Sequence, residues 1–487
     1  MSKKSLTLAV SVIVLLSMLL TACGGAADPT AAPAAEAPTA EAPATEAPAA
    51  AVAPTEAPAT AAPATGDATK IRWYIGLGAG GNPEEIEKEN AFVDAFNAKY
   101  GDKYQLVTDI VQSDTANDVL KTQIASGDCP DIVGPVGVRG MAGFEGAWLD
   151  MTPYIEAVNY DVSDFNPALI EFYNFEGQGQ IGLPFAVYPS ALYYNTDLFD
   201  EAGLDYPPHE WGAPYADGDA WTFDKMKELA QFLTVDANGN DATSPDFDPD
   251  AVEQFGYHPM WSDIRGAWTF FGAGSFADSE GNAQIPEVWR EAAKWYYDGM
   301  WTDHFIPNDS YVNSDLLGQG NTFGSGAVAM NPNHTWYTCC TEGANWDVAA
   351  IPSYQDHLTA KLHADTFGIL QCSKNPQAAF DVLTLMLGEY APDLVQTYGA
   401  FPARESLQET SLAAMQEAFP NADLQVFVDA LSYPDNPNHE SGMPNFLKAS
   451  DVYATFGAKY GSTAGLDIDA ELDALKVELQ KTFDEVK

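Results

Sequence analysis

The apolar and polar residues after about residue 68 follow two alternating periods. Apolar runs at 70–75, 104–108 and 131–134 predict buried strands. Between them, apolar residues recur every three or four positions in segments that begin at Asn82-Pro83 and at Thr115, which predicts helices. Strands and helices that alternate at this spacing indicate βαβ units with a parallel sheet.

The same alternation continues to the C-terminus. It predicts a strand around Ala191–Tyr194, a helix capped by Thr222, and amphipathic helices over 287–297, 376–387 and 469–486. The roughly 420 residues involved are too many for one core and enough for two lobes. We therefore expect an α/β protein with two lobes.

The first 66 residues have a different pattern. Lys3 and Lys4 precede an apolar run, Leu6–Leu20, which is too short to span a bilayer and predicts a signal segment over residues 1–23. Residues 24–68 are mostly Ala, Pro, Thr and Glu, which predicts a disordered, semi-rigid linker. The sequence Leu-Thr-Ala-Cys ending at Cys23 resembles the lipobox of bacterial lipoproteins, and this implies that Cys23 carries a lipid anchor.

The charge balance narrows the choice of ligand. Asp and Glu number 70 against 22 Lys and Arg, giving a formal net charge of -48, which opposes binding to nucleic acid or anionic lipid. Arginine, the residue best suited to clamp phosphate or several carboxylates, is scarce and scattered. Neutral or cationic ligands are favoured.

Two loops resemble known binding motifs. The loop 76–81 fits G-x-G-x-x-G, but its helix begins after the third glycine and the chain is expected to be exported, so we predict no nucleotide cofactor. We interpret it as a loop whose bare backbone can approach a ligand. Asp236, Asn238 and Asn240 alternate as in a calcium loop, but glycine and glutamate are missing at its sixth and twelfth positions, which favours a surface turn.

Four cysteines follow Cys23. Outside the cell an even set could form disulfides, and the pairing of Cys129, Cys339, Cys340 and Cys372 is open. Because adjacent cysteines are awkward partners, we expect any bridge from Cys339 or Cys340 to reach a distant cysteine. The chain contains no H-E-x-x-H motif, and paired acids for glycoside hydrolysis cannot be recognised from sequence spacing.

A set of segments in fixed order carries the most specific signal. They read IASGDCPDIV (124–133), LDMTPYI (149–155), GLPFAVYPSALYYNTDLF (182–199), GAVAM (326–330), WDVAAIP (346–352) and GAFPAR (399–404). In these segments the chain resembles the extracellular solute-binding proteins of sugar-importing ABC systems, the broad family of maltose-binding protein, from about Lys70 to the C-terminus.

The resemblance implies a periplasmic-binding-protein-like fold of two α/β lobes that close on a ligand through a hinge. It places the N-lobe at 69–186 plus 366–400 and the C-lobe at 187–365 plus 401–487, with crossovers near 186–188, 365–370 and 399–403. It implies a monomeric, lipid-anchored subunit on the outer face of the bacterial cytoplasmic membrane, which delivers a sugar or oligosaccharide to an ABC permease. Neither catalysis nor a cofactor is expected.

The resemblance also implies ligand contacts. Sugar sites combine flat aromatic side chains with polar groups at their rims. The matching positions are Tyr188, Trp336, Arg139 and Tyr453, with Trp261, Asp263 and Trp268 in a more loosely aligned stretch. Leu77, Pro135 and Val138 depart from the maltose-binding pattern, so a maltodextrin site is not implied.

Other interpretations remain open. Each of the aromatic residues could instead belong to the core. The same scaffold could bind a polyamine or a glycerol-phosphate compound. The chain could also be an exported glycoside-acting enzyme, which turnover of oligosaccharides would reveal.

Overall fold

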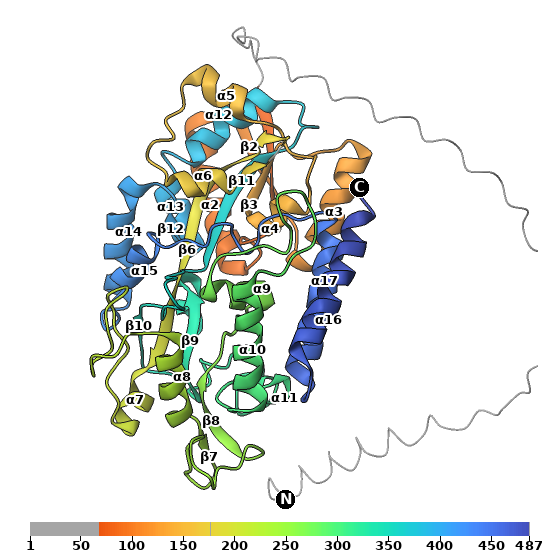
Figure 1. Ribbon diagram of the computed structural model, residues 1–487. Coiled ribbons are helices and arrows are strands. Elements are labelled where there is room, and N and C mark those ends of the chain that lie inside the picture. Colours follow the sequence, from red (N-terminus) through yellow and green to blue (C-terminus); the bar gives the residue numbers. More distant parts are fainter. Residues whose placement is uncertain (1–67, 176, 487) are drawn as a thin grey trace, which may run out of the picture. The chain divides into compact units, whose positions relative to one another are not determined.

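The computed structural model describes residues 68–175 and 177–486 (Figure 1). The signal segment, Cys23 and nearly all of the linker lie outside the described residues. Within the described part, no helix is both long and apolar enough to cross a bilayer.

The first half of the main sheet is built as the sequence predicts. β1 (Thr69–Ile75) lies between β2 (Tyr104–Ile110) and β3 (Ile132–Gly137), and all three are parallel. β11 (Leu362–Ile369) then adds to β3 in the antiparallel direction. Phe92, Phe96 and Phe380 pack with Trp73 in a hydrophobic core on this half.

A single long strand, β6 (Gly182–Asn195), continues into the second half of the sheet. Residues 182–189 pair with β11 and with the short β12 (Phe401–Pro402), whereas residues 190–195 pair with β9 (Val328–His334) and β10 (Trp346–Ala349). β8 (Val252–Tyr257) and β7 (Val235–Asp236) complete the path. In Figure 1, β6 and β11 run side by side along the junction of the two halves.

The helices surround both sheet halves. The first half carries α2 (Pro83–Tyr100), α3 (Ser113–Ser126), α4 (Val138–Ala142), α5 (Thr152–Val158), α6 (Pro167–Glu171), α12 (Pro376–Met386) and α13 (Ala391–Thr397). The second half carries α7 (Thr196–Ala202), α8 (Phe223–Phe232), α9 (Ile264–Trp268), α10 (Glu287–Trp301), α11 (Asp309–Val312), α15 (Gln425–Ala430), α16 (Phe446–Ser462) and α17 (Ile468–Asp484), and α14 (Glu405–Ala418) packs against β12 and α13. Short pieces are β4 (Asn174–Phe175), β5 (Gly179–Gln180), and the 3₁₀ turns η1 (Thr269–Phe271), η2 (Gly318–Gly320) and η3 (Thr335–Cys340).

Local signals determine where several of these helices begin and end. α2 follows Asn82, whose backbone N–H donates to Glu85 Oε2 at 3.0 Å. α3 begins two residues before the expected Thr115 and ends at Gly127, whose φ of 72° is left-handed. Thr222 caps α8 by accepting a hydrogen bond from the Lys225 N–H at 3.2 Å.

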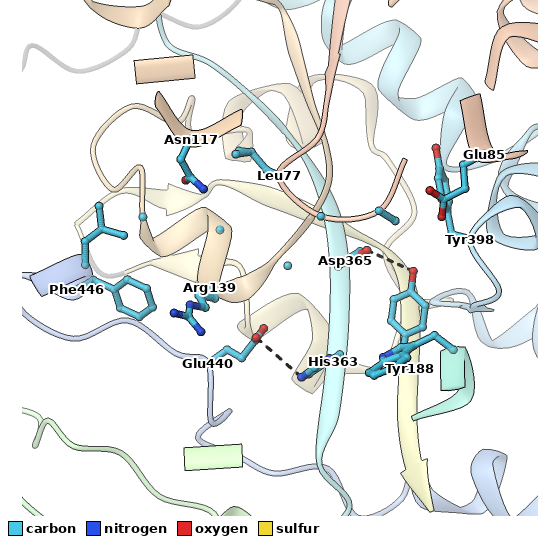
Figure 2. A pocket seen from close by; sticks show the side chains of 17 residues that line it. Leu77, Glu85, Asn117, Arg139, Tyr188, His363, Asp365, Tyr398, Glu440 and Phe446 are labelled. Carbon is cyan, nitrogen blue, oxygen red and sulfur yellow. Dashed lines mark hydrogen bonds and ion pairs between the residues drawn. The ribbon is translucent and has the colours of Figure 1, made fainter. Parts of the chain in front are cut away.

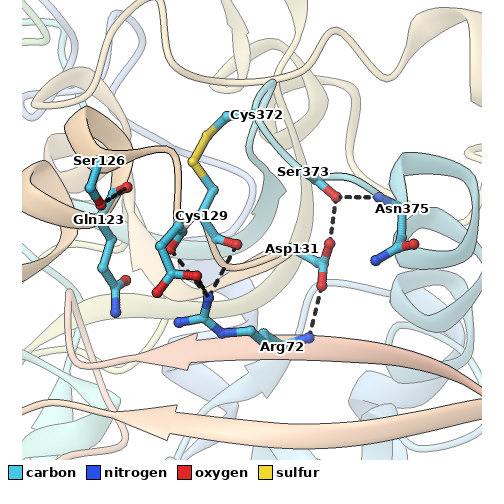
Figure 3. Close-up of a disulfide and its surroundings, with 9 residues drawn as sticks. Arg72, Gln123, Ser126, Cys129, Asp131, Cys372, Ser373 and Asn375 are labelled. Carbon is cyan, nitrogen blue, oxygen red and sulfur yellow. Dashed lines mark hydrogen bonds and ion pairs between the residues drawn. A yellow bond between two sulfur atoms is a disulfide. The ribbon is translucent and has the colours of Figure 1, made fainter.

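The disulfides differ from the expectation. Cys129 pairs with Cys372 (Figure 3), with 5.9 Å between their Cα atoms, and Cys339 pairs with its neighbour Cys340. The expected bridge from the adjacent pair to a distant cysteine is therefore wrong. β3 and β11 are neighbours in the sheet, which brings the turns that carry Cys129 and Cys372 together and leaves the adjacent cysteines for each other.

The loop after Asp236, whose sequence partly resembles a calcium loop, is a network of turns. The buried Asp236 carboxylate accepts hydrogen bonds from the N–H groups of Asn238, Asn240 and Asp248 at 2.8–2.9 Å. Burial opposes ionisation, but these hydrogen bonds outweigh it and lower the pKa of Asp236. The carboxylate thus organises the backbone, as expected of a turn.

Candidate functional site

A cavity of about 510 Å³ opens where the two sheet halves meet (Figure 2). We call it the main cavity because of this position; a larger and more open hollow of about 1180 Å³ adjoins it at Phe446. The walls of the main cavity come from the loop after β1, the starts of α2 and α3, the turn from β3 into α4, the paired strands β6 and β11, η3, the end of α13, and the segment that leads into α16. The lining residues are Leu77, Gly78, Ala79, Glu85, Asn117, Gly137, Arg139, Gly140, Gly143, Tyr188, Trp336, His363, Asp365, Tyr398, Glu440, Phe446 and Leu447.

The glycine loop after β1 forms part of this wall. A Cβ at Gly78 would lie 2.8 Å from the Pro135 carbonyl oxygen, so the backbone there approaches its neighbour more closely than a side chain allows. Leu77, Gly78 and Ala79 all line the cavity. The loop is therefore placed where its backbone can meet a bound molecule.

Aromatic rings form a platform on another wall. Trp336 is partly exposed and stacks on His334, with ring centroids 5.6 Å apart, and on Trp261, with centroids 5.8 Å apart. Trp261 is 52 % exposed and has a left-handed backbone, with φ of 55°. Holding a bulky residue in that conformation costs free energy, and such residues cluster at binding sites.

Carboxylates also line this cavity. The Tyr188 hydroxyl donates to Asp365 Oδ2 at 3.3 Å. Burial, and then the charge of Glu440, raises the pKa of Asp365 to about 7. Glu85 lines the cavity as a third acid. The cavity therefore offers hydrogen-bond acceptors and negative charge.

Arg139 connects the two sides of the cavity opening. Its Nη1 lies 3.8 Å from Asp263 Oδ2, which also caps α9 by accepting the Gly266 N–H at 2.9 Å. Burial opposes ionisation of Asp263, but the Gly266 hydrogen bond and the charge of Arg265 outweigh it and lower the pKa. Because α4 follows the first sheet half and α9 belongs to the second, this pair spans the junction.

The structure separates the predicted contacts into three groups. Tyr188, Trp336 and Arg139 line the main cavity, and Trp261 extends the platform outward from Trp336. Asp263, Trp268 and Tyr453 line a neighbouring cavity of about 330 Å³. Trp268 and Tyr453 are 1 % and 2 % exposed and pack against core rings such as Phe276.

Sequence reasoning missed several residues of the main cavity. His363 and Asp365 lie on β11, whose C-terminal part was recognised only as a crossover. Tyr398, directly after α13, and Glu440 also line the cavity. Glu440 follows a turn-rich stretch whose sequence does not indicate a binding site. Their meeting depends on which segments the sheet brings beside β11.

Two sheet halves joined by continuous strands, with a polar and aromatic cavity at the junction, define a two-lobed α/β binding protein. The sequence model of the bacterial extracellular solute-binding proteins matches residues 80–391, and the chain belongs to that family.

Solved structures agree with this fold. UspC of M. tuberculosis is 20% identical, with a TM-score of 0.64 over 85% of this chain and 100% of that one. The ABC substrate-binding protein Lmo0181 of Listeria monocytogenes, solved with cycloalternan, is 21% identical, with a TM-score of 0.65 over 86% and 100%. The sugar-binding protein MalE of Xanthomonas citri is 16% identical, with a TM-score of 0.65 over 86% and 98%.

Proposed function

We propose that this protein is the substrate-binding subunit of an ABC importer and binds a sugar or oligosaccharide in the main cavity. The platform of Trp336 and Trp261, at a cavity that acceptor groups also line, carries the proposal. Sugars present apolar C–H faces that stack on aromatic rings and hydroxyls that donate to carboxylates. A volume of about 510 Å³ falls in the usual range for small-molecule sites.

The similar structures support the ligand class. Lmo0181 was solved with cycloalternan, and the Xanthomonas citri relative is described as a sugar-binding protein. The residues that we propose to contact the sugar are Tyr188, Trp336, Arg139 and Trp261. Asp263 acts through Arg139, and Trp268 and Tyr453 support the second cavity.

Binding would serve transport if the permease distinguishes loaded from empty protein. Ligand contacts from both lobes stabilise the closed form selectively, and a permease that recognises this form receives loaded protein. Export, acylation at Cys23 and the linker would keep the receptor near its permease at high local concentration. Cell fractionation tests the anchor: the wild type should stay in the membrane fraction, and Cys23→Ser should not.

A polyamine is the second candidate ligand. Glu85, Asp365 and Glu440 all line the cavity, whereas its arginine, Arg139, already faces Asp263. This surplus of carboxylates would favour a cationic ligand.

A thermal-shift screen of the full-length chain against sugars, polyamines and phosphorylated polyols tests these proposals. A cognate ligand at about one hundred times its Kd should add about 2.7 kcal/mol to the free energy of unfolding. Trp336→Ala should reduce the shift at the same ligand concentration. Phe232→Ala, which removes an exposed ring on α8, is the matched control and should leave it unchanged.

Stabilisation by a polyamine but by no sugar would overturn the sugar assignment. Release of product from an oligosaccharide during the incubation would contradict a purely binding role.

A further inference from the structure

Two imidazoles and a carboxylate meet on one wall of the main cavity. His363 comes from β11, and His439 and Glu440 come from the segment before α16. One donor atom from each residue lies within 4.8 Å of the other two. Across residues 68–175 and 177–486, no other group of three His, Cys, Asp or Glu side chains is arranged in this way.

A buried carboxylate fixes the tautomer of His439. Its Nδ1 lies 2.7 Å from Asp435 Oδ2, and Asp435 also accepts the backbone N–H groups of His439 and Leu362 at 2.9 Å. Since the carboxylate accepts, Nδ1 carries the proton and Nε2 keeps its lone pair. Histidines that bind metals are typically oriented by a carboxylate in this way.

Neighbouring rings hold His363. Its ring lies between His334 and His439, with centroids 3.9 and 5.2 Å away and planes within 22° of parallel. Its Nε2 approaches Glu440 Oε1 at 3.9 Å (Figure 2). The side chains of His363 and Glu440 are 28 % and 20 % exposed, so an ion can reach them from the cavity.

Two nearby carboxylates favour a cation, and the charge of the buried Lys361, whose Nζ and His439 Cδ2 would both lie 3.5 Å from a Cβ on Gly266, works in the opposite direction. A Cβ placed on Gly137 would lie 3.4 Å from Glu440 Oε2 and 3.5 Å from Asp365 Oδ1, so both carboxylates converge on that glycine. Among the described residues neither forms an ion pair with lysine or arginine, because Arg139 faces Asp263 and Lys361 Nζ bonds Ser262 Oγ at 2.5 Å. A bound cation would relieve the repulsion between the two acids.

We propose that His363, His439 and Glu440 bind a divalent transition-metal ion of the zinc type, with one coordination position open to the cavity. Two histidines and one glutamate form a known zinc donor set that leaves room for a fourth ligand. With bonds of about 2.0 Å, tetrahedral donors lie about 3.3 Å apart, so the partly exposed His363 and Glu440 side chains must move inward. The His363 ring must also turn out of its stack on His439, because an imidazole binds a metal in the plane of its ring. A water or a hydroxyl of the bound solute can take the open position.

Zinc titration of the full-length chain, freed of metal by a chelator and without sugar, tests the proposal. Competition with a chromophoric chelator should give one ion per chain, and Co²⁺ in its place should produce the visible absorption of a tetrahedral site. His363→Ala and Glu440→Gln should each weaken Zn²⁺ binding at least tenfold. His357→Ala, which removes an exposed histidine elsewhere, should have no effect.

Glu440→Gln keeps the size of a partly exposed side chain, and its melting curve in chelator shows whether it folds like the wild type. Equal Zn²⁺ affinity of the folded Glu440→Gln variant and the wild type would overturn the proposal. So would the absence of stoichiometric binding to the wild type. Because no sugar is present, either failure is independent of the proposed transport function.

Discussion

Two tryptophans seven positions apart illustrate how burial separates packing from binding at the scale of single residues. Trp268 is 1 % exposed and packs edge-on against Phe276 and Trp289, whereas Trp261 is 52 % exposed and stacks on Trp336. Trp268→Ala should lower the free energy of unfolding by about 3–5 kcal/mol, because it leaves a cavity in the core. Trp261→Ala should cost under about 1 kcal/mol. Urea denaturation measures both, and equal losses would contradict this division.

Glu89 should make stability depend on pH. Burial raises its pKa to about 7 against an ordinary value of 4.5, although a hydrogen bond from the Tyr398 hydroxyl at 2.8 Å works in the opposite direction. Between these values the unfolded chain releases the proton and the folded chain keeps it. The free energy of unfolding should therefore fall by about 3 kcal/mol in total as pH rises from 4.5 to 7.

Glu89→Gln removes this titration. The variant should match the wild type near pH 4 and exceed its stability by about 3 kcal/mol at pH 8. Glu87→Gln, on the exposed side of the same helix, is the control and should follow the wild type at both values. Denaturant melts at the two pH values give the comparison, and a constant difference between Glu89→Gln and the wild type would refute it.

Elements with clear local signals could be predicted, and those defined by distant pairing could not. α2, α8 and α12 begin at a cap or a proline near the expected residue, because these signals act within one turn. β6 is far longer than the predicted 191–194. The sequence pattern indicated only its second part, because Pro184 and Pro189 interrupt the first part, where β11 accommodates Pro184 by a shift in register. Helices are therefore easier to predict here than the strand that crosses the junction.

The residues of the candidate site also divide into those with a local sequence signal and those without one. Tyr188, Trp336 and Arg139 could be proposed because each lies in or at a fixed interval from a recognised segment, and all three line one cavity. His363 and Glu440 carry no local signal, and they meet because the segment before α16 packs beside β11. Such pairings depend on the tertiary arrangement and not on sequence spacing.

The Cys129–Cys372 disulfide ties two such distant elements together. It closes a loop between residues 243 positions apart and joins the turns next to β3 and β11. Replacing both cysteines with serine should lower the free energy of unfolding by about 3–5 kcal/mol, since a long closed loop restricts the unfolded chain. The matched Cys339→Ser and Cys340→Ser double variant removes a bridge between neighbours and should cost far less. Equal losses in urea melts would contradict this account.

The whole molecule is organised around the junction of its two sheet halves. The antiparallel neighbours β6 and β11 both run through this junction. Arg139 and Asp263 form an ion pair between the two sides, and residues from both sides line the main cavity. A ligand held by both sides would favour the closed arrangement by its difference in affinity for the two states. The lobe boundaries at 186–187, 365–366 and 400–401 remain predictions of the sequence.

Calorimetric titration of the full-length chain with the sugar that gives the largest thermal shift tests the central claim most directly. The account predicts binding of one sugar per chain, weakened at least tenfold in Trp336→Ala and unchanged in Phe232→Ala. Sugar binding that Trp336→Ala leaves intact, or heat of binding from polyamines alone, would contradict it.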